Sequence, residues 1–255
     1  MLTKLAIKIA APLPQLENYD RYLFIGPHPD DIEIGAGASV ARLCAQGKDV
    51  RYLICTDGRF GFDHISGVTP EELKEIRREE TKKAAAFLGV KEVKFLDLCD
   101  GGFYTKEELL RGILQTIGEW QPQVVFVTDP DVSSECHVDH RNAGDRAKEA
   151  CLFCENEEIA KSYGAKTAVV EALAFYMTAK PDRYIGVRGY RAKQLSAVFD
   201  FHVSQYPPDC DANATLQLYM RLRALEYGIR SFKGEAEGFR VLGRIHRHCL
   251  PEAGK

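Results

Sequence analysis

The sequence predicts an α/β fold of three layers, in which a mostly parallel, Rossmann-like sheet is flanked by helices. Short apolar segments alternate with segments of helical length up to about residue 153, which is the pattern of repeated βαβ units. Polar clusters directly follow two of the apolar segments, as ligand sites do at the carboxyl ends of parallel strands. The composition, with 45% hydrophobic and 28% charged residues in 255, is that of a folded globular protein.

The expected strands are short apolar runs bounded by turn residues, and they cover residues 21–26, 49–56, 93–98, 123–129, 168–177 and about 238–246. The expected helices lie between them or near the C-terminus, at about 35–46, 70–88, 106–120, 140–153, 189–199 and 212–232. No linker separates the C-terminal part. The sequence therefore predicts a single domain over residues 1–255, in which the sheet and helices are extended from about residue 168.

The helix over 70–88 has the clearest limits. Thr69 is a suitable N-cap, Pro70 takes the first helical position, and Glu72 completes a capping box. Gly89 ends the helix. The turn-rich stretch before it, residues 57–69, is expected to be a loop at the rim of the sheet.

The bulk properties exclude several function classes. A formal net charge of -3 gives no reason to expect a nucleic acid or an anionic membrane as partner. No segment approaches the ~18 apolar residues of a membrane span, and Lys8 interrupts the apolar N-terminus, so no signal peptide is expected. The eight cysteines indicate free thiols and a cytoplasmic protein, with Cys151 and Cys154 as buried helical residues.

Two polar clusters are expected to meet at one edge of the sheet. The segment PHPDDIEIGAG brings His28, Asp30 and Asp31 directly after the first strand. The segment SSECHVDHRNAG follows the strand that ends near residue 129, and HVDH within it contributes His137, Asp139 and His140. Adjacent aspartates repel each other, so their presence at one corner suggests that a cation binds there.

His28, Asp31 and His140 together offer two imidazoles and a carboxylate, which is the usual composition of a catalytic zinc site with one open position. Iron or manganese would also accept this set. Spacing alone does not say which of the adjacent aspartates binds the metal and which faces the bound water. A carboxylate there can accept a proton as the water attacks a carbonyl, and an imidazole held by a carboxylate, such as His137 beside Asp139, can stabilise the oxyanion.

Other readings of these motifs remain open from the residues alone. HPDD is also compatible with a helix N-cap beside a surface histidine, and HVDH with a solvated helix start. A dinucleotide-binding module would need its glycines at the first turn, but Gly35 lies far from Gly26, and Val40 takes the place of the third glycine. A metal-dependent phosphoesterase would typically need more carboxylates and two metals. A non-catalytic descendant is the last alternative, although every residue that the chemistry needs is present.

The chain resembles the LmbE-like (PIG-L) family of zinc-dependent N-acetylglucosaminyl deacetylases. The resemblance runs through PHPDDIEIGAG, TDG, IRREE, the DG of 100–101, HVDH and EGFRV, and is closest to the diacetylchitobiose deacetylase branch. It implies hydrolytic removal of the N-acetyl group from an N-acetylglucosamine-containing small molecule or short oligosaccharide, by attack of metal-bound water. An amidase of a non-aminosugar acyl amide is the alternative.

The resemblance also implies residue roles. The family's zinc ligands correspond to His28, Asp31 and His140. The general base corresponds to Asp30. His137, oriented by Asp139, would stabilise the tetrahedral intermediate and assist the leaving amine. Members are commonly homo-oligomers, often hexamers, so an oligomer is expected here.

Three further residues match substrate-side positions of the family. Arg77 would contact the substrate, although an ion pair on a charged helix face explains it equally well. Asp100 would hold sugar hydroxyls, or would simply form a turn. His248 would complete the site of a neighbouring subunit, or would be a surface histidine. Two departures from the family pattern are Arg59, where many members have glutamate, and Val138, where many have proline.

Overall fold

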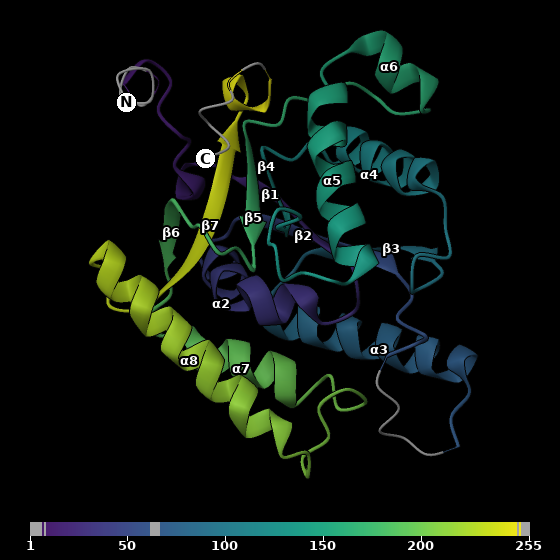
Figure 1. The fold of residues 1–255 in the computed structure, drawn as a ribbon, viewed down its shortest axis with the longest axis vertical. Coiled ribbons are helices and arrows are strands. Elements are labelled where there is room, and N and C mark those ends of the chain that lie inside the picture. Colours follow the sequence, from purple (N-terminus) through teal and green to yellow (C-terminus); the bar gives the residue numbers. More distant parts are fainter. Residues whose placement is uncertain (1–6, 8, 62–66, 249, 251–255) are drawn as a thin grey trace.

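The structure, a computed structural model, describes residues 7, 9–61, 67–248 and 250 (Figure 1). Among these residues, seven strands form one sheet in the order β3-β2-β1-β4-β5-β7-β6. The strands are β1 (Arg21–Gly26), β2 (Asp49–Thr56), β3 (Glu92–Leu98), β4 (Val124–Thr128), β5 (Ala172–Tyr176), β6 (Arg183–Gly186) and β7 (Ala236–Gly243). The first five strands in chain order pair in parallel, and β7 runs antiparallel to β5 and β6. The predicted mostly parallel sheet is confirmed.

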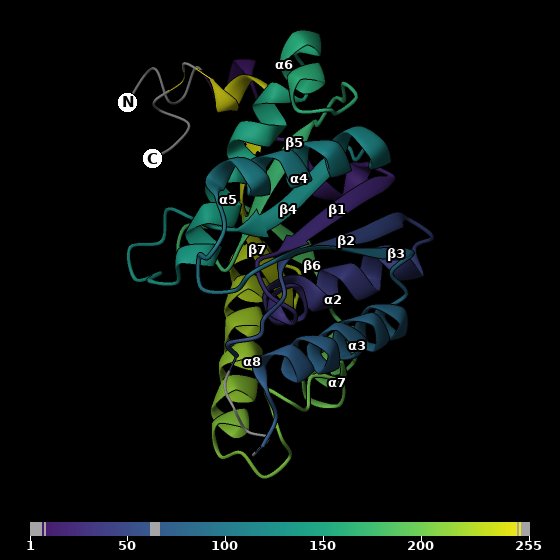
Figure 2. The ribbon, with the colours of Figure 1, turned by 90° about the vertical axis from the view of Figure 1, so that its right-hand side faces the viewer.

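Helices cover both faces of the sheet, which gives the three layers expected from the sequence (Figure 2). One face carries α2 (Asp31–Ala45), α3 (Pro70–Leu88), α7 (Arg191–Phe199) and α8 (Ala212–Ser231). The other carries α4 (Lys106–Trp120), α5 (Val138–Phe153) and α6 (Glu157–Ser162). Short 3₁₀ turns, η1 (Leu16–Asn18) and η2 (Ile245–Arg247), lie outside these layers. None of the described helices is long and apolar enough to cross a membrane.

The alternation of side chains along β1 divides the core in two. Tyr22 and Phe24 pack into the cluster under α2 and α3, whereas Leu23 and Ile25 pack into the cluster under α4 and α5. All four side chains are almost completely buried. A strand that is apolar on both faces belongs in the middle of a sheet covered on both sides, and β1 lies between β2 and β4.

The limits of α3 agree with the sequence prediction. The Thr69 hydroxyl accepts the backbone N–H of Glu72, and the Glu72 carboxylate accepts the backbone N–H of Thr69, so the capping box is formed. Gly89 ends the helix in the left-handed conformation, with φ 98°. That conformation suits a residue without Cβ.

Some elements differ from the prediction. Helix α2 begins at Asp31 rather than at residue 35, because Asp30 turns the chain sharply with φ 119° as it leaves β1. Strand β7 ends at Gly243, and His246 lies in η2, so the expected strand to residue 246 is wrong there. Strand β6 and helix α6 were not predicted, since both are short and carry weak periodicity.

A buried carboxyl group joins β7 to α2 and gives a prediction about stability. Glu237 accepts the backbone N–H groups of Ala38 and Ser39 at 3.2 and 2.8 Å, and burial raises the pKa of Glu237 to about 7. The folded protein therefore keeps a proton that the unfolded chain has released between about pH 4.5 and pH 7, so Glu237 makes stability fall as pH rises through that window.

We expect Glu237→Gln to remove this pH dependence. Between about pH 5 and about pH 8, the free energy of unfolding should fall further in the wild type than in the variant. The extra loss should be on the order of 3 kcal/mol. Denaturant unfolding at both pH values measures it, with the exposed Glu158→Gln as the control that should change nothing. Parallel pH curves for wild type and Glu237→Gln would contradict the expectation.

Candidate metal-dependent active site

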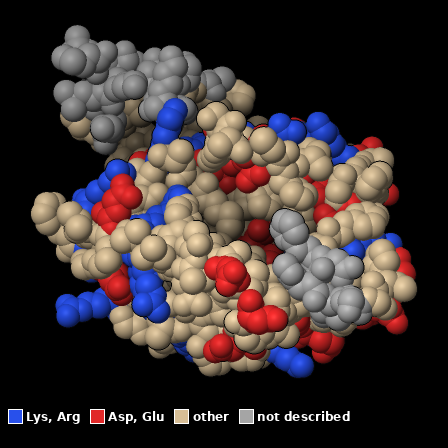
Figure 3. All heavy atoms as spheres, turned by 60° about the horizontal axis from the view of Figure 1, so that its bottom comes forward, with Lys and Arg blue, Asp and Glu red and all other residues tan. Residues whose placement is uncertain are grey.

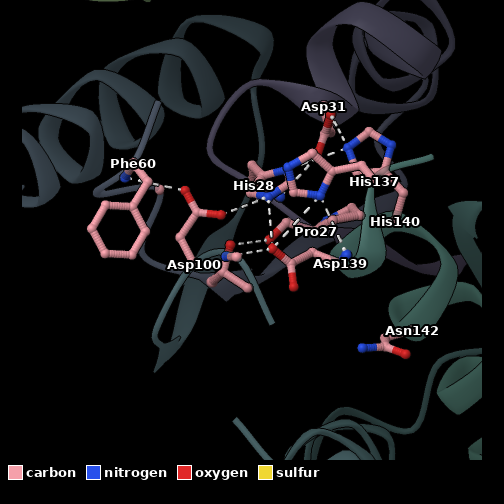
Figure 4. Close-up of polar contacts among 12 residues, drawn as sticks. Pro27, His28, Asp31, Phe60, Asp100, His137, Asp139, His140 and Asn142 are labelled. Atoms are coloured by element: carbon pink, nitrogen blue, oxygen red, sulfur yellow. Dashed lines mark hydrogen bonds and ion pairs between the residues drawn. The ribbon is translucent and has the colours of Figure 1, made fainter. Parts of the chain in front are cut away.

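The two polar clusters lie side by side at the carboxyl edge of the sheet. The first follows β1 and the second follows β4, and these strands are paired neighbours. His28 and Asp31 therefore meet His140, which lies in the first turn of α5, although more than a hundred residues separate them in sequence. Figure 4 shows how these side chains converge around His28.

The three donors have the spacing of metal ligands. His28 Nδ1 lies 3.2 Å from Asp31 Oδ2 and 3.2 Å from His140 Nε2. His140 Nε2 lies 3.3 Å from Asp31 Oδ1. Tetrahedral ligands that are bound at about 2.0–2.1 Å lie roughly 3.3 Å from one another. Each ring nitrogen has that spacing to the other ring nitrogen and to one of the two Asp31 oxygens, and one donor atom from each residue lies within 4.8 Å of the others.

Carboxylates hold the far nitrogen of each imidazole. His28 Nε2 lies 3.1 Å from Asp100 Oδ1 and 3.2 Å from Asp139 Oδ2, and His140 Nδ1 lies 2.9 Å from Glu135 Oε2. When these nitrogens donate, the two remaining ring lone pairs face each other and the Asp31 carboxylate. That arrangement is repulsive unless a cation lies between the two rings and the carboxylate, so the residues fit a divalent metal.

The electrostatics agree with the geometry. Burial lowers the pKa of His140, but the Asp31 carboxylate outweighs burial and raises this pKa to about 9. Burial likewise opposes protonation of His28, yet Asp100, Asp139 and Asp31 raise the pKa of His28 well above its usual range. The centre thus favours positive charge at these two rings, which a divalent ion supplies when it binds.

Asp30 lies beside the ligand set in an unusual conformation. Its φ of 119° places the buried carboxylate between two donors: Arg77 Nη2 lies 3.3 Å from Oδ1, and the Tyr206 hydroxyl donates to Oδ2 at 3.1 Å. Burial raises the pKa of Asp30, and the nearby Arg77 charge partly offsets this effect. A strained, tightly held carboxylate of raised pKa is typical of a general base.

His137 contacts both the backbone and the carboxylate of Asp139. Its Nδ1 accepts the backbone N–H of Asp139 at 3.3 Å, whereas the Asp139 carboxylate is 3.7 Å away, which is too long for a hydrogen bond. The carboxylate instead accepts the Tyr104 hydroxyl, the Gly101 N–H and His28 Nε2. The backbone contact assigns the proton of a neutral His137 ring to Nε2, and burial lowers the pKa of His137.

A cavity of about 270 Å³ opens onto these groups. Its lining brings together the two clusters and residues from other loops, namely His28, Asp30, Asp31, Phe60, Gly61, Arg77, Asp100, His137, Gln205 and Tyr206. Figure 3 shows this side of the molecule hollowed near its centre, with acidic side chains inside the hollow. Phe60 and Phe103 form an edge-to-face pair at the rim, with centroids 6.0 Å apart. The rest of the predicted rim loop, residues 62–66 with Phe62, lies outside the described residues.

The three candidate substrate-binding residues, Arg77, Asp100 and His248, differ in burial and in position relative to the cavity. Arg77 is buried rather than exposed on a charged helix face, and its guanidinium donates to the carbonyls of Gly58 and Pro29. Asp100 accepts the N–H of Phe60 as well as contacting His28, so its carboxylate is engaged on both sides. His248 is exposed after β7, whose antiparallel direction carries it to the sheet edge opposite this cavity. Arg59, the departure from the family pattern, pairs with Asp57 and Glu71.

Sequence reasoning missed two residues of the site, Glu135 and Tyr206. Glu135 lies within the quoted SSECHVDH segment, but a glutamate two residues before a histidine carries no distinctive signal. Tyr206 comes from the HVSQY segment between α7 and α8. Buried bonds hold this segment, because Glu80 accepts both the N–H and the hydroxyl of Ser204 at 2.8 and 2.6 Å. Only the tertiary fold brings that segment to Asp30.

Removal of the Tyr206 hydroxyl tests its hold on Asp30. We expect Tyr206→Phe to lower kcat about tenfold, because a lost hydrogen bond to a carboxylate is worth roughly 1.4 kcal/mol. The acidic limb of the pH profile should also move to higher pH, since the lost donor favoured the charged carboxylate. Tyr184→Phe on β6 is the control, because it removes a hydroxyl that donates to the Pro181 carbonyl, outside the residues that line the cavity. A lower kcat with an unmoved pH profile would mean that the hydroxyl does not act on Asp30.

The chain is similar to several known proteins. Residues 23–151 match the family described as PIG-L, GlcNAc-PI de-N-acetylase. The chain is 35% identical to the diacetylchitobiose deacetylase of Thermococcus kodakarensis, over 99% of this chain and 93% of that protein. The structure of N,N'-diacetylchitobiose deacetylase from Pyrococcus horikoshii superposes with a TM-score of 0.88, at 28% identity over 98% of this chain and 94% of that one.

The same fold also supports other chemistry. The hydratase GalB of Pseudomonas putida matches with a TM-score of 0.72 at 20% identity, over 88% of this chain and 96% of that one. At that identity the likeness shows the fold alone. The arrangement of side chains therefore carries the functional argument here.

Proposed function

Because the chain belongs to the PIG-L family of de-N-acetylases, we propose that it removes the N-acetyl group from an N-acetylglucosamine-containing small molecule or short oligosaccharide with the help of bound Zn²⁺. One observation carries the proposal: the donors of His28, Asp31 and His140 converge beside Asp30. His28, Asp30 and Asp31 also line the cavity. Two imidazoles and a carboxylate suit zinc, and Fe²⁺ or Mn²⁺ are the alternatives.

Asp30, Arg77 and Tyr206 have different roles in the proposed amide hydrolysis. A divalent ion supplies a water of lowered pKa and polarises the amide carbonyl when it is bound. Asp30 accepts the proton of the attacking water, and its raised pKa suits it to pass that proton to the departing amine. Arg77 and Tyr206 fix the two oxygens of Asp30. The net reaction consumes one water and yields acetate and a free amine.

His137 stabilises the oxyanion of the tetrahedral intermediate by donating a hydrogen bond. Its neutral ring carries the proton on Nε2, because Nδ1 accepts the backbone N–H of Asp139. A neutral N–H donor stabilises the negative oxygen of the tetrahedral intermediate without first losing a proton. The lowered pKa of His137 favours this role over that of the acid for the leaving amine.

The substrate class rests on the cavity and the relatives. A cavity of about 270 Å³ is of the size that holds one sugar ring, and the exposed ring pair of Phe60 and Phe103 lies at its rim. We place the N-acetylglucosamine unit in this cavity, with Asp100 and Arg77 at its polar wall. The deacetylase relatives act on diacetylchitobiose and on an inositol-linked glucosaminide by their names, which are the two substrate types to test.

The proposal extends to the assembly. We propose one domain over the whole chain and a homo-oligomer, with the hexamer as the expected form. His248 lies at the sheet edge opposite its own cavity, so any contact that it makes with substrate is to the site of another subunit.

The deciding experiment measures acetate release by the zinc-loaded protein from N-acetylglucosamine, diacetylchitobiose, an inositol-linked and a malate-linked N-acetylglucosaminide. Release from any of them that stops on chelation, and returns with zinc, supports the proposal and names the substrate class. If zinc is bound but no member of the panel releases acetate, the aminosugar assignment is wrong, and non-aminosugar acyl amides become the next substrates to try.

A further inference from the structure

Helix α8 carries a row of apolar side chains on its outer face. The row consists of Leu218, Leu222, Leu225 and Ile229 on the helix and of Phe232 at its C-cap, which are 56%, 56%, 45%, 75% and 98% exposed. We call it the α8 stripe. The opposite face of α8 is already used, because Met220, Ala224 and Tyr227 are buried against the body of the protein. Figures 1 and 2 show α8 along the margin of the molecule, with no described element outside it.

The spacing of the stripe is that of paired helices. The four helical members are four, three and four residues apart, which keeps them on one line of a helix that packs against another helix. Phe232 follows three residues later, at the left-handed C-cap. Polar residues flank the line, and among them Arg230 pairs with Glu226 at 2.5 Å. A narrow apolar line between charged flanks matches the core and rim of a protein interface.

The stripe is also close to symmetric about Leu225. Leu218 and Phe232 each lie seven residues from it, and Leu222 and Ile229 lie three and four residues from it. An antiparallel copy of the same helix would therefore place Leu225 on the two-fold axis and bring apolar residues opposite apolar residues. Such self-complementarity is what an isologous interface requires.

The area is sufficient for a stable pair. Together with the half-exposed Tyr219, the exposed parts of the stripe amount to roughly 700 Å² per chain, close to the ~800 Å² that each partner buries in an interface of standard size. The formal net charge of -3 does not favour an anionic lipid surface as the occupant of the stripe.

We propose that α8 pairs with α8 of a second copy of this chain, antiparallel and across a two-fold axis at Leu225. This inference stands apart from the proposed chemistry, because none of its residues lines the cavity beside Asp30. It identifies one contact surface, whatever the total number of subunits.

Sedimentation of the full chain tests the contact. We expect Leu222→Glu combined with Ile229→Glu to halve the assembled mass while the circular dichroism spectrum stays unchanged, because both positions are exposed in one subunit. The matched control combines Leu152→Glu with Val169→Glu, two exposed apolar residues outside α8, and should keep the wild-type mass. An unchanged mass in the α8 variant, or a monomeric wild type, overturns the proposal.

Cysteine cross-linking tests the direction of the pair. Under mild oxidation, Leu225→Cys should form a covalent dimer beyond the background of the wild type, whereas Leu218→Cys should not link to itself. Efficient self-linking of Leu218→Cys would show a parallel pair and overturn the antiparallel arrangement. Wild-type binding to vesicles of phosphatidylcholine and phosphatidylserine, lost in the glutamate variant, would identify the stripe as a membrane contact instead.

Discussion

Replacing Asp30 with asparagine should abolish turnover while the metal stays bound. The amide introduced by Asp30→Asn cannot accept a proton from the attacking water, and loss of a general base costs roughly 10²–10⁴-fold in rate. Asparagine is the informative substitution, because it tolerates the positive φ of this position better than other residues of its size. Its carbonyl oxygen can still accept the Tyr206 hydroxyl. We therefore expect a fold and a metal content like those of the wild type, and kcat lower by about 10³-fold.

The neighbouring Asp31→Asn is the matched comparison. It makes the same chemical change one residue later, at a carboxylate that lies 3.2–3.3 Å from two ring nitrogens. We expect it to lose metal affinity as well as activity. Metal analysis after gel filtration separates the two outcomes. If Asp30→Asn released the metal and Asp31→Asn kept it, the assignment of base and ligand would have to be exchanged.

The sequence predicted the sheet well because each central strand is locally distinctive. The segments of β1 and β4 are apolar on both faces, and only a parallel sheet covered on both sides buries such strands fully. The topological rule for parallel sheets then brought HPDD and HVDH to one edge. The capping residues of α3 were equally local signals, and they are formed as expected.

The details that the sequence missed depend on long-range contacts. The start of α2 was misplaced because no local sequence pattern predicts the positive φ of Asp30. Arg77 and Tyr206, which come from distant segments, contact the Asp30 carboxylate. The contact of His137 with Asp139 is an ion-pair distance of 3.7 Å rather than a side-chain hydrogen bond for a similar reason. The Asp139 carboxylate is drawn to Tyr104, Gly101 and His28, three partners that spacing alone could not reveal.

The removal of His140 should weaken metal binding severely. His140→Ala deletes one of three protein ligands, leaving only His28 and Asp31, and a two-ligand site binds zinc far more weakly. A protein that binds zinc in its folded state is stabilised by RT ln(1 + [Zn]/Kd), so metal binding can be followed without any substrate. We expect added Zn²⁺ to raise the Tm of chelator-treated wild type clearly and to leave that of His140→Ala almost unchanged.

Glu135→Gln provides the graded counterpart of that experiment. Glu135 does not reach the ligand centre itself, but its carboxylate accepts the far nitrogen of His140 at 2.9 Å and fixes the ring. Loss of such an outer partner typically costs 10–100-fold in metal affinity, so the zinc titration of the Tm should shift to higher concentration by about that factor and still saturate. A titration identical to that of the wild type would show that Glu135 does not support the site. A complete loss of response would mean that Glu135 is itself a ligand, and the three-residue centre would then have to be redrawn with four.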